Sequence, residues 1–135
     1  EGTFCLAMIE TQEAFDNLED IASTPGLDGL YIGTADLTIG LNQGKLRPGF
    51  DRTEPEMIEA KKKILEIAHK HEKVACLHCG TPEYAAKATN WGFDLVTITN
   101  DVRLLSGAAA THVKKFKELT NQKTDISSET DNSSY

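Results

Sequence analysis

Two acidic residues, Glu10 and Asp36, each follow a short apolar run and could take part in metal chemistry. Asp36 is reached through a turn of three small residues, Gly33, Thr34 and Ala35. Carboxylate oxygens are the hard ligands that Mg²⁺ and Mn²⁺ prefer, and Mg²⁺ usually keeps several of its water molecules. The pair therefore predicts a divalent-metal site, provided that the fold brings the ends of the two runs together.

The small residues before Asp36 are suited to binding an anion. Gly33 carries no side chain, so the backbone N–H groups of this turn could hold a carboxylate beside the metal. A plainer interpretation competes with this one. Glu10 and Asp36 would be capping acids at the start of the following helices, where acidic residues are common. Spacing alone leaves both interpretations open.

Four short apolar runs predict strands buried on both faces, as in parallel sheets. Amphipathic segments alternate with these runs, and Thr11 and Thr53 are predicted to cap the first two helices. The predicted strands are Phe4–Ile9, Leu30–Ile32 with its flanks, Val74–Leu77 and Leu95–Ile98, and the predicted helices span 11–24, 54–71, 81–91 and 101–119. This alternation implies right-handed crossovers and a parallel sheet, whose carboxyl ends gather the chemistry.

Four strand–helix units predict an α/β fold, either a small open sheet or the C-terminal portion of a (β/α)8 TIM barrel. A complete barrel takes roughly 250 residues, whereas this chain has 135. We expect one domain over residues 1–119, followed by a polar C-terminal tail over residues 120–135. Either architecture would place Glu10 and Asp36 at the same edge of the sheet.

The composition excludes several classes of protein. A formal charge of −7 argues against non-specific binding of nucleic acid. No apolar run approaches the roughly 20 residues that span a bilayer, so no membrane association is expected. The cysteines, Cys5, Cys76 and Cys79, are few and odd in number, which predicts a reducing compartment and a cytoplasmic protein.

Other residues could carry chemistry, but each has a structural interpretation that we favour. Cys76 and Cys79 form a C-x-x-C pattern, and Cys76 lies inside a predicted strand, so core packing is favoured over a redox pair or a zinc site. His78 is expected to be a partly buried structural residue. Arg47 and Arg52 lie in a long loop, 40–53, whose length mildly favours a lid or a subunit contact. Both arginines could meet an anionic substrate, although a solvated loop is the default.

Two linked segments, MIETQEAFDNLEDIASTPGLDGLYIGTADLTIGLN and LHCGTPEYAAKATNWGFDLVTITNDVRLL, resemble the HpcH/HpaI aldolase family. The resemblance implies a class II, metal-dependent pyruvate aldolase on a (β/α)8 barrel. Such enzymes cleave 4-hydroxy-2-oxoacids, such as 2,4-dihydroxyhept-2-ene-1,7-dioate, to pyruvate and an aldehyde. It also implies that this chain is the C-terminal half of a longer enzyme, inactive on its own, and that the enzyme is a homo-oligomer. The final helix, 101–119, would contact a neighbouring subunit.

The resemblance also assigns roles to residues. Glu10 and Asp36 match the family's ligands for a divalent metal (Mg²⁺, Mn²⁺ or Co²⁺). The turn that binds the pyruvate carboxylate is matched by Gly33, Thr34 and Ala35, although Thr34 replaces the usual proline, which would loosen the turn. Met8 replaces a glutamine found in many members.

Two further roles of the family have no match in this sequence. The catalytic base, a histidine, and the substrate-binding arginine come from the first half of the family's barrel. We therefore expect both residues upstream of Glu1, and no catalytic residue is assigned within the chain.

Two alternative functions remain open. One is a carbon–carbon lyase similar to citrate lyase or malyl-CoA lyase. The other is a non-catalytic half-barrel that retains metal binding. In either case a half-barrel has open sheet edges, so we expect the isolated chain to dimerise, to aggregate or to exist only with its missing half.

Overall fold

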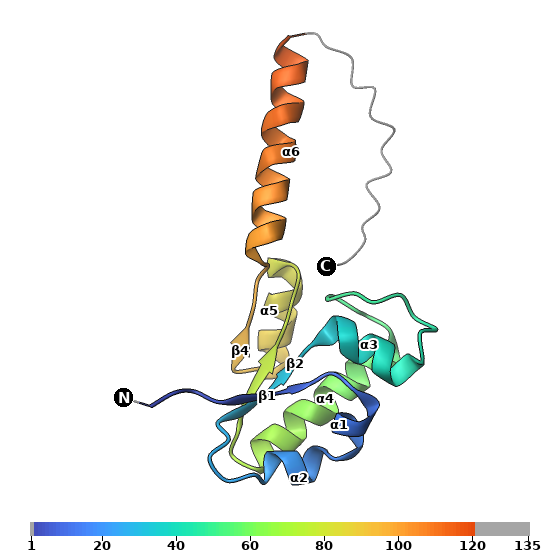
Figure 1. The fold of residues 1–135 in the computed structure, drawn as a ribbon, viewed down its shortest axis with the longest axis vertical. Helices are drawn as coiled ribbons and strands as arrows, with labels where there is room; N and C mark the ends of the chain where they lie inside the picture. The colour runs from blue at the N-terminus through green and yellow to red at the C-terminus, as the bar shows by residue number, and fades with distance from the viewer. Residues whose placement is uncertain (1, 121–135) are drawn as a thin grey trace. The chain divides into compact units, whose positions relative to one another are not determined.

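Within residues 2–120, which the computed structural model describes, four parallel strands form one sheet in the order β1-β2-β3-β4 (Figure 1). The register pairs Ile9 with Ile32, Ile32 with Leu77, and Leu77 with Val96. The strands are β1 (Leu6–Ile9), β2 (Gly29–Ile32), β3 (Val74–Leu77) and β4 (Leu95–Val96). The predicted α/β class is therefore confirmed, with shorter first and last strands than the apolar runs indicated.

The helices alternate with the strands as the sequence predicts, but there are more of them. They are α1 (Gln12–Asp16), α2 (Leu18–Ala22), α3 (Thr34–Asn42), α4 (Pro55–Lys70), α5 (Pro82–Trp91) and α6 (Asp101–Leu119). In residues 2–120, none of these helices combines the length and apolar character that crossing a membrane requires.

The predicted domain (1–119) and tail (120–135) stay predictions, because the structure describes only part of this span. Contacts divide the chain into one unit that ends at Ile98 and another that begins at Thr99 and contains α6. Glu1, the predicted first residue of the domain, lies outside the described residues. Of the predicted tail, only Thr120 is described, as the C-cap of α6, and residues 121–135 also lie outside.

The helices of the first unit cover one face of the sheet. Ile9, Ile32 and Leu77 are fully buried on that face and share a core with Met57 and Ile64 of α4. Figure 1 shows α1, α2 and α4 together on one side of the strands.

The other face of the sheet is open. Successive side chains of a strand point to opposite faces, and on this second face Met8 is 54% exposed and Leu95 is 43% exposed. The prediction of strands buried on both faces therefore holds for β3, where Ala75, Cys76 and Leu77 are all buried, but not at Met8 of β1 or Leu95 of β4, because among residues 2–98 the helices cover one face only.

The predicted first helix is divided in two at Asn17. This residue ends α1 and begins α2 with φ −106° and ψ 24°, outside the helical range. Its side chain donates a hydrogen bond to the carbonyl oxygen of Glu13 at 2.7 Å. Asparagine competes with helical hydrogen bonds in this way, which explains the break. The predicted cap at Thr11 is confirmed, because its Oγ1 accepts a hydrogen bond from the backbone N–H of Ala14.

Helix α3 is not predicted from the sequence, which indicates a turn over residues 33–35 and a long loop over 40–53. The segment TADLTIGLN is rich in threonine and glycine, which are poor helix formers. Burial of Ala35, Leu37 and Thr38 against the rest of the unit stabilises it instead. At Gly40 a Cβ atom would lie 3.1 Å from the backbone of Glu10 and Thr11, so this glycine lets α3 pack closely against the end of β1.

The starts of the later helices agree with the sequence except at α4. The N-cap of α4 is Glu54 rather than Thr53, because Pro55 occupies the first helical position. Helix α5 is capped by Thr81 and ends at Trp91, in agreement with the predicted 81–91 span, and the φ of +109° at its C-cap, Gly92, suits a residue without a Cβ atom. The predicted 101–119 helix is confirmed, and Asn100 caps it.

Helix α4 carries a fully buried lysine, Lys61. Lys61 of α4 donates hydrogen bonds from Nζ to the hydroxyl of Tyr84 at 2.8 Å and to the carbonyl oxygen of Arg52 at 3.3 Å. The same carbonyl accepts a second hydrogen bond, from Tyr84, at 2.6 Å. Burial lowers the pKa of Lys61 to about 8. The ammonium ion is therefore costly to bury at neutral pH.

We predict that Lys61→Met raises the free energy of unfolding at pH 7 by about 1–3 kcal/mol. The Arg52 carbonyl keeps its hydrogen bond from Tyr84, so no polar group is left unpaired. In the parent chain the unfolded state binds more protons between pH 8 and 10.5. Stability therefore rises with pH in that window, and the variant should lose this rise.

Urea unfolding at pH 7 and pH 9 checks this prediction. The range stops there because burial raises the pKa of the Cys79 thiol to about 11. At higher pH the unfolded state loses this proton first, and the free energy of unfolding then falls. Lys62→Met at an exposed neighbouring position is the control. A Lys61→Met variant less stable than the control at pH 7 would contradict the prediction.

Candidate active site

Glu10, Gly33 and His78 lie side by side on the open face, one residue past the ends of three adjacent strands. The pairing continues beyond the strands, since the N–H of Gly33 donates to Ile9 and the N–H of His78 donates to Ile32. Alternation along each strand then places residues 10, 33 and 78 on the face that the helices leave open. The carboxyl end of the open face therefore carries a carboxylate, a bare backbone position and an imidazole.

The carboxylate of Glu10 lies against Gly33. A Cβ atom at position 33 would be 2.9 Å from Glu10 Oε2, 3.3 Å from Glu10 Cβ and 3.4 Å from Met8 Sδ. The φ of Gly33 is −80°, which any residue can adopt, so the glycine provides space rather than an unusual conformation. The structure thus brings Glu10 to the predicted anion-binding turn.

The predicted turn is the start of helix α3. Gly33 is the N-cap, no side chain caps this terminus, and Asp36 lies in the first turn. Thr34 and Ala35 are buried, while Asp36 is exposed. A helix N-terminus offers N–H groups and a partial positive charge to an anion, so the local geometry suits the carboxylate-binding role.

The interpretation of Glu10 and Asp36 as helix-capping acids has a different outcome at each residue. Glu10 does not cap a helix, because Thr11 caps α1. Asp36 occupies the first turn of α3, where a carboxylate stabilises the helix dipole whether or not it binds a metal. The alternative therefore loses support at Glu10 and stays open at Asp36.

Thr34 ties the start of α3 to the end of β3. Its hydroxyl is fully buried and donates a hydrogen bond to the carbonyl oxygen of His78 at 3.1 Å. The Thr34 carbonyl in turn accepts a hydrogen bond from the hydroxyl of Thr38 at 2.7 Å. The looser turn expected from the loss of proline is offset by this connection between neighbouring elements.

In residues 2–120, no group of three or more histidine, cysteine, aspartate and glutamate side chains is arranged to hold a metal ion. Glu10 and Asp36 would supply two oxygen ligands, which suits an ion that keeps several waters and binds substrate oxygens. The donor chemistry therefore fits Mg²⁺ or Mn²⁺, and the assignment of these two ligands stays a prediction.

The base and the arginine expected upstream of Glu1 have no counterpart in the described site. Glu1 itself lies outside the described residues, which begin at Gly2. The location of these two groups therefore stays a prediction, as do the metal- and anion-binding roles of the described residues.

Sequence reasoning missed a partner of His78. The hydroxyl of Tyr31 lies 2.7 Å from His78 Nδ1, and the Phe50 ring lies 4.7 Å from the imidazole, centroid to centroid. Burial lowers the pKa of His78, partly opposed by the charge of Asp51. Burial also raises the pKa of Tyr31. His78 is half-buried as expected, but its contacts depend on the strand register and on a distant loop.

The loop before α4 is fixed to the start of α5. The carboxylate of Asp51 accepts hydrogen bonds from the N–H of Gly80 and the hydroxyl of Thr81, both at 2.7 Å. The guanidinium of Arg52 pairs with Glu54, so it is already engaged within the chain. The proposed encounter of Arg52 with an anionic substrate loses support, and that of Arg47 stays a prediction.

The cysteines of the C-x-x-C pattern are core residues. Cys76 and Cys79 are free thiols and both are fully buried, whereas Cys5 is free and exposed. Burial raises the pKa of Cys76 and raises that of Cys79 to about 11. A redox cysteine needs a lowered pKa, so the prediction of core packing is confirmed.

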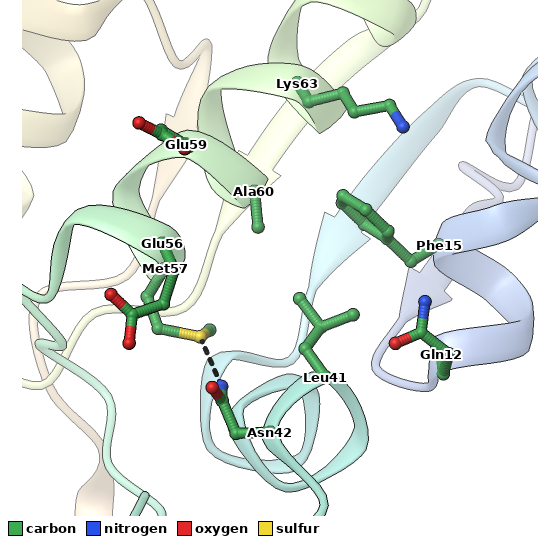
Figure 2. A pocket seen from close by; sticks show the side chains of 9 residues that line it. All are labelled: Gln12, Phe15, Leu41, Asn42, Glu56, Met57, Glu59, Ala60 and Lys63. Carbon is green, nitrogen blue, oxygen red and sulfur yellow. Dashed lines mark hydrogen bonds between the residues drawn. The ribbon is translucent and has the colours of Figure 1, made fainter.

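A groove of about 370 Å³ lies elsewhere, between α1, α3 and α4 (Figure 2). Phe15, Leu41 and Met57 line its apolar part, and Lys63 Nζ lies 4.7 Å from the centroid of the Phe15 ring. Figure 2 also shows the hydrogen bond from Asn42 to the sulfur of Met57. None of the predicted metal- or substrate-binding residues lines this groove.

Comparison with known proteins adds independent evidence. A hydroxypyruvate/pyruvate aldolase of Rhizorhabdus wittichii is 39% identical over 104 residues, which are 77% of this chain and 40% of that protein. A 5-keto-4-deoxy-D-glucarate aldolase of Klebsiella pneumoniae is 31% identical over 113 residues, 84% of this chain and 42% of that protein. The chain thus spans about two fifths of the length of these relatives.

A solved structure and a family profile agree with the sequence relatives. The crystal structure of an HpcH/HpaI aldolase/citrate lyase family protein from Burkholderia cenocepacia matches with a TM-score of 0.72 and 25% identity. The match covers 85% of this chain and 43% of that one. Residues 1–106 match the family described as HpcH/HpaI aldolase/citrate lyase. This chain therefore belongs to the HpcH/HpaI aldolase/citrate lyase family.

Proposed function

We propose that this chain carries the metal- and oxoacid-binding part of a divalent-metal-dependent aldolase. Glu10 and Asp36 are the metal ligands, and the N–H groups at the start of α3, from Gly33 to Ala35, bind the substrate carboxylate. One observation carries the proposal. The Glu10 carboxylate lies against the bare backbone of Gly33, at a helix N-terminus that no side chain caps. An anion and a cation could therefore be held next to each other there.

The division of labour follows from the charges. Cleavage of a carbon–carbon bond beside a ketone leaves an enolate, whose negative charge a bound divalent cation stabilises as a Lewis acid. The start of α3 orients the substrate through its carboxylate, and burial of Thr34 and Ala35 keeps this turn in place. The proton of the 4-hydroxyl group needs a base, which we expect upstream of Glu1, together with a substrate-binding arginine.

The substrate class is inferred from the relatives. One relative is a hydroxypyruvate/pyruvate aldolase and another is a 5-keto-4-deoxy-D-glucarate aldolase. Both names describe oxoacid chemistry. We propose 4-hydroxy-2-oxoacids as substrates, with pyruvate or hydroxypyruvate as the fragment that forms the enolate.

We also propose a cytoplasmic homo-oligomer. Taken by itself, α6 carries one apolar stripe at helical spacing, formed by Val102, Leu105, Val113 and Phe116, all exposed. A stripe of this kind requires a covering surface, and a neighbouring subunit would supply it. The free cysteines suit a reducing compartment.

We predict that the chain binds Mn²⁺ at one site and that Glu10→Gln or Asp36→Asn weakens binding at least about tenfold. Each substitution removes a negative oxygen ligand while keeping the shape of the side chain. Water-proton relaxation measures the binding, with and without pyruvate. Glu13→Gln, an exposed acid in the first turn of α1, is the matched control. Variants and parent that bind Mn²⁺ equally would refute the ligand assignment.

Gly33→Ala tests the carboxylate-binding turn. The added Cβ atom would sit 2.9 Å from Glu10 Oε2 and displace that carboxylate. We expect weaker Mn²⁺ binding and a smaller effect of pyruvate, with an unchanged circular dichroism spectrum. Gly107→Ala, where a Cβ atom meets nothing within 4 Å, is the control. Undiminished binding in Gly33→Ala would show that the Glu10 carboxylate does not need this position.

The α6 stripe makes a separate prediction about assembly. A charge at Leu105 or Phe116 should prevent burial of the stripe, so Leu105→Glu and Phe116→Glu should lower the molar mass measured by light scattering. Lys114→Glu, on the opposite side of the helix, should leave it unchanged. Equal masses for all four chains would exclude α6 as the contact.

A further inference from the structure

We propose that His78 is a second substrate-binding residue of this site, which donates a hydrogen bond from Nε2 to an oxygen of the bound oxoacid. The inference rests on the proposed function, since it assumes that the oxoacid carboxylate binds at the start of α3. It adds a group on the β3 side of the substrate, opposite Glu10. Four observations carry it.

The first observation is the position of His78. Gly33 lies between Glu10 and His78 in one row, and adjacent strands are about 4.8 Å apart. An anion at the start of α3 would therefore be flanked by Glu10 on one side and by His78 on the other. The hydrogen bond from Thr34 to the His78 carbonyl, 3.1 Å long, places His78 next to this turn.

The second observation is the charge state of the imidazole. Burial favours the neutral ring, because it lowers the pKa of His78, although Asp51 opposes it. Burial also raises the pKa of Tyr31, so the phenol keeps its proton. The hydroxyl of Tyr31 lies 2.7 Å from Nδ1. We take this hydroxyl as the donor, which places the ring proton on Nε2. His78 then offers a neutral N–H donor, not a charge.

The third observation is that the ring is held from two sides. Tyr31 contacts it edge-on, with centroids 6.2 Å apart, and Phe50 packs at 4.7 Å. The residue after Phe50, Asp51, is bonded to Gly80 and Thr81. The ring therefore keeps its orientation at little entropic cost when a ligand binds.

The fourth observation is the face to which the ring belongs. Residue 78 lies on the side of the sheet that the helices of the first unit do not cover. His78 is half-buried, so part of the side chain remains accessible. Its polar atoms can therefore reach a ligand bound at this edge of the sheet.

Nuclear magnetic resonance of the unsubstituted chain tests the inference directly. Long-range ¹H–¹⁵N spectra report the tautomer of each histidine, and His78→Gln identifies the His78 signals. We expect the Nε2–H tautomer at pH 7. Adding Mg²⁺ and pyruvate should shift His78 Nε2, while the signals of His112 in α6 stay unchanged. The shift itself is measured in the unsubstituted chain, and His78→Gln serves only to assign the signal.

Two substitutions give a second readout through the pyruvate affinity of the Mn²⁺-loaded chain. His78→Leu removes the donor and should weaken pyruvate binding about fivefold, the effect of one hydrogen bond. His78→Gln retains an N–H donor near the position of Nε2 and should restore most of the affinity. His112→Leu is the control.

The outcomes separate this inference from the proposed function. If pyruvate binding depends on Glu10 but neither shifts the His78 signal nor responds to His78→Leu, His78 has only a packing role and the inference is overturned. Equal losses in His78→Leu and His78→Gln would also overturn it. If pyruvate binds to none of these chains, the proposed function fails, and this inference fails with it.

Discussion

The parallel, in-register pairing of β1, β2 and β3 is the constraint on which the candidate site depends. It places residues 10, 33 and 78 in one row, because each is the first residue after its strand. Side chains alternate between the two faces, so a shift of one residue in any pair would turn a member of this row toward the helices. The carboxylate, the bare backbone and the imidazole are thus positioned by the ladder and not by their own contacts.

Hydrogen bonds from the helices and the loop hold the site residues in the positions that the sheet gives them. Thr34 joins the start of α3 to β3, Asp51 joins the loop to the start of α5, and Lys61 holds the carbonyl of Arg52. Among the described side chains, no buried nitrogen or oxygen lacks a hydrogen-bond partner. Satisfied polar contacts of this kind fix orientation more than they add net stability. The buried Lys61 shows the cost, since its ammonium ion is desolvated at neutral pH.

Local patterns predicted the parts of the fold that have local causes. The four strands, the cap at Thr11 and the stop at Gly92 each have a signal within a few residues. Helix α3 has no such signal, because contacts with other elements stabilise a segment of weak helix formers. The site divides in the same way. Glu10 and the small-residue turn were recognisable from spacing, whereas the pairing of Tyr31 with His78 depends on register between residues 47 positions apart in sequence.

The three free thiols differ in exposure, so their alkylation rates can report local opening of the folded chain. Cys5 is exposed in the folded chain, while Cys76 and Cys79 are enclosed on β3 and just beyond it. Thiolates are the species that alkylating reagents attack, and both enclosed thiols have raised pKa values. Alkylation at Cys5 therefore proceeds on the native chain, and alkylation at the other two requires an opening of the structure that exposes them. Comparison of the two rates therefore reports how often the region around β3 opens, without any added probe.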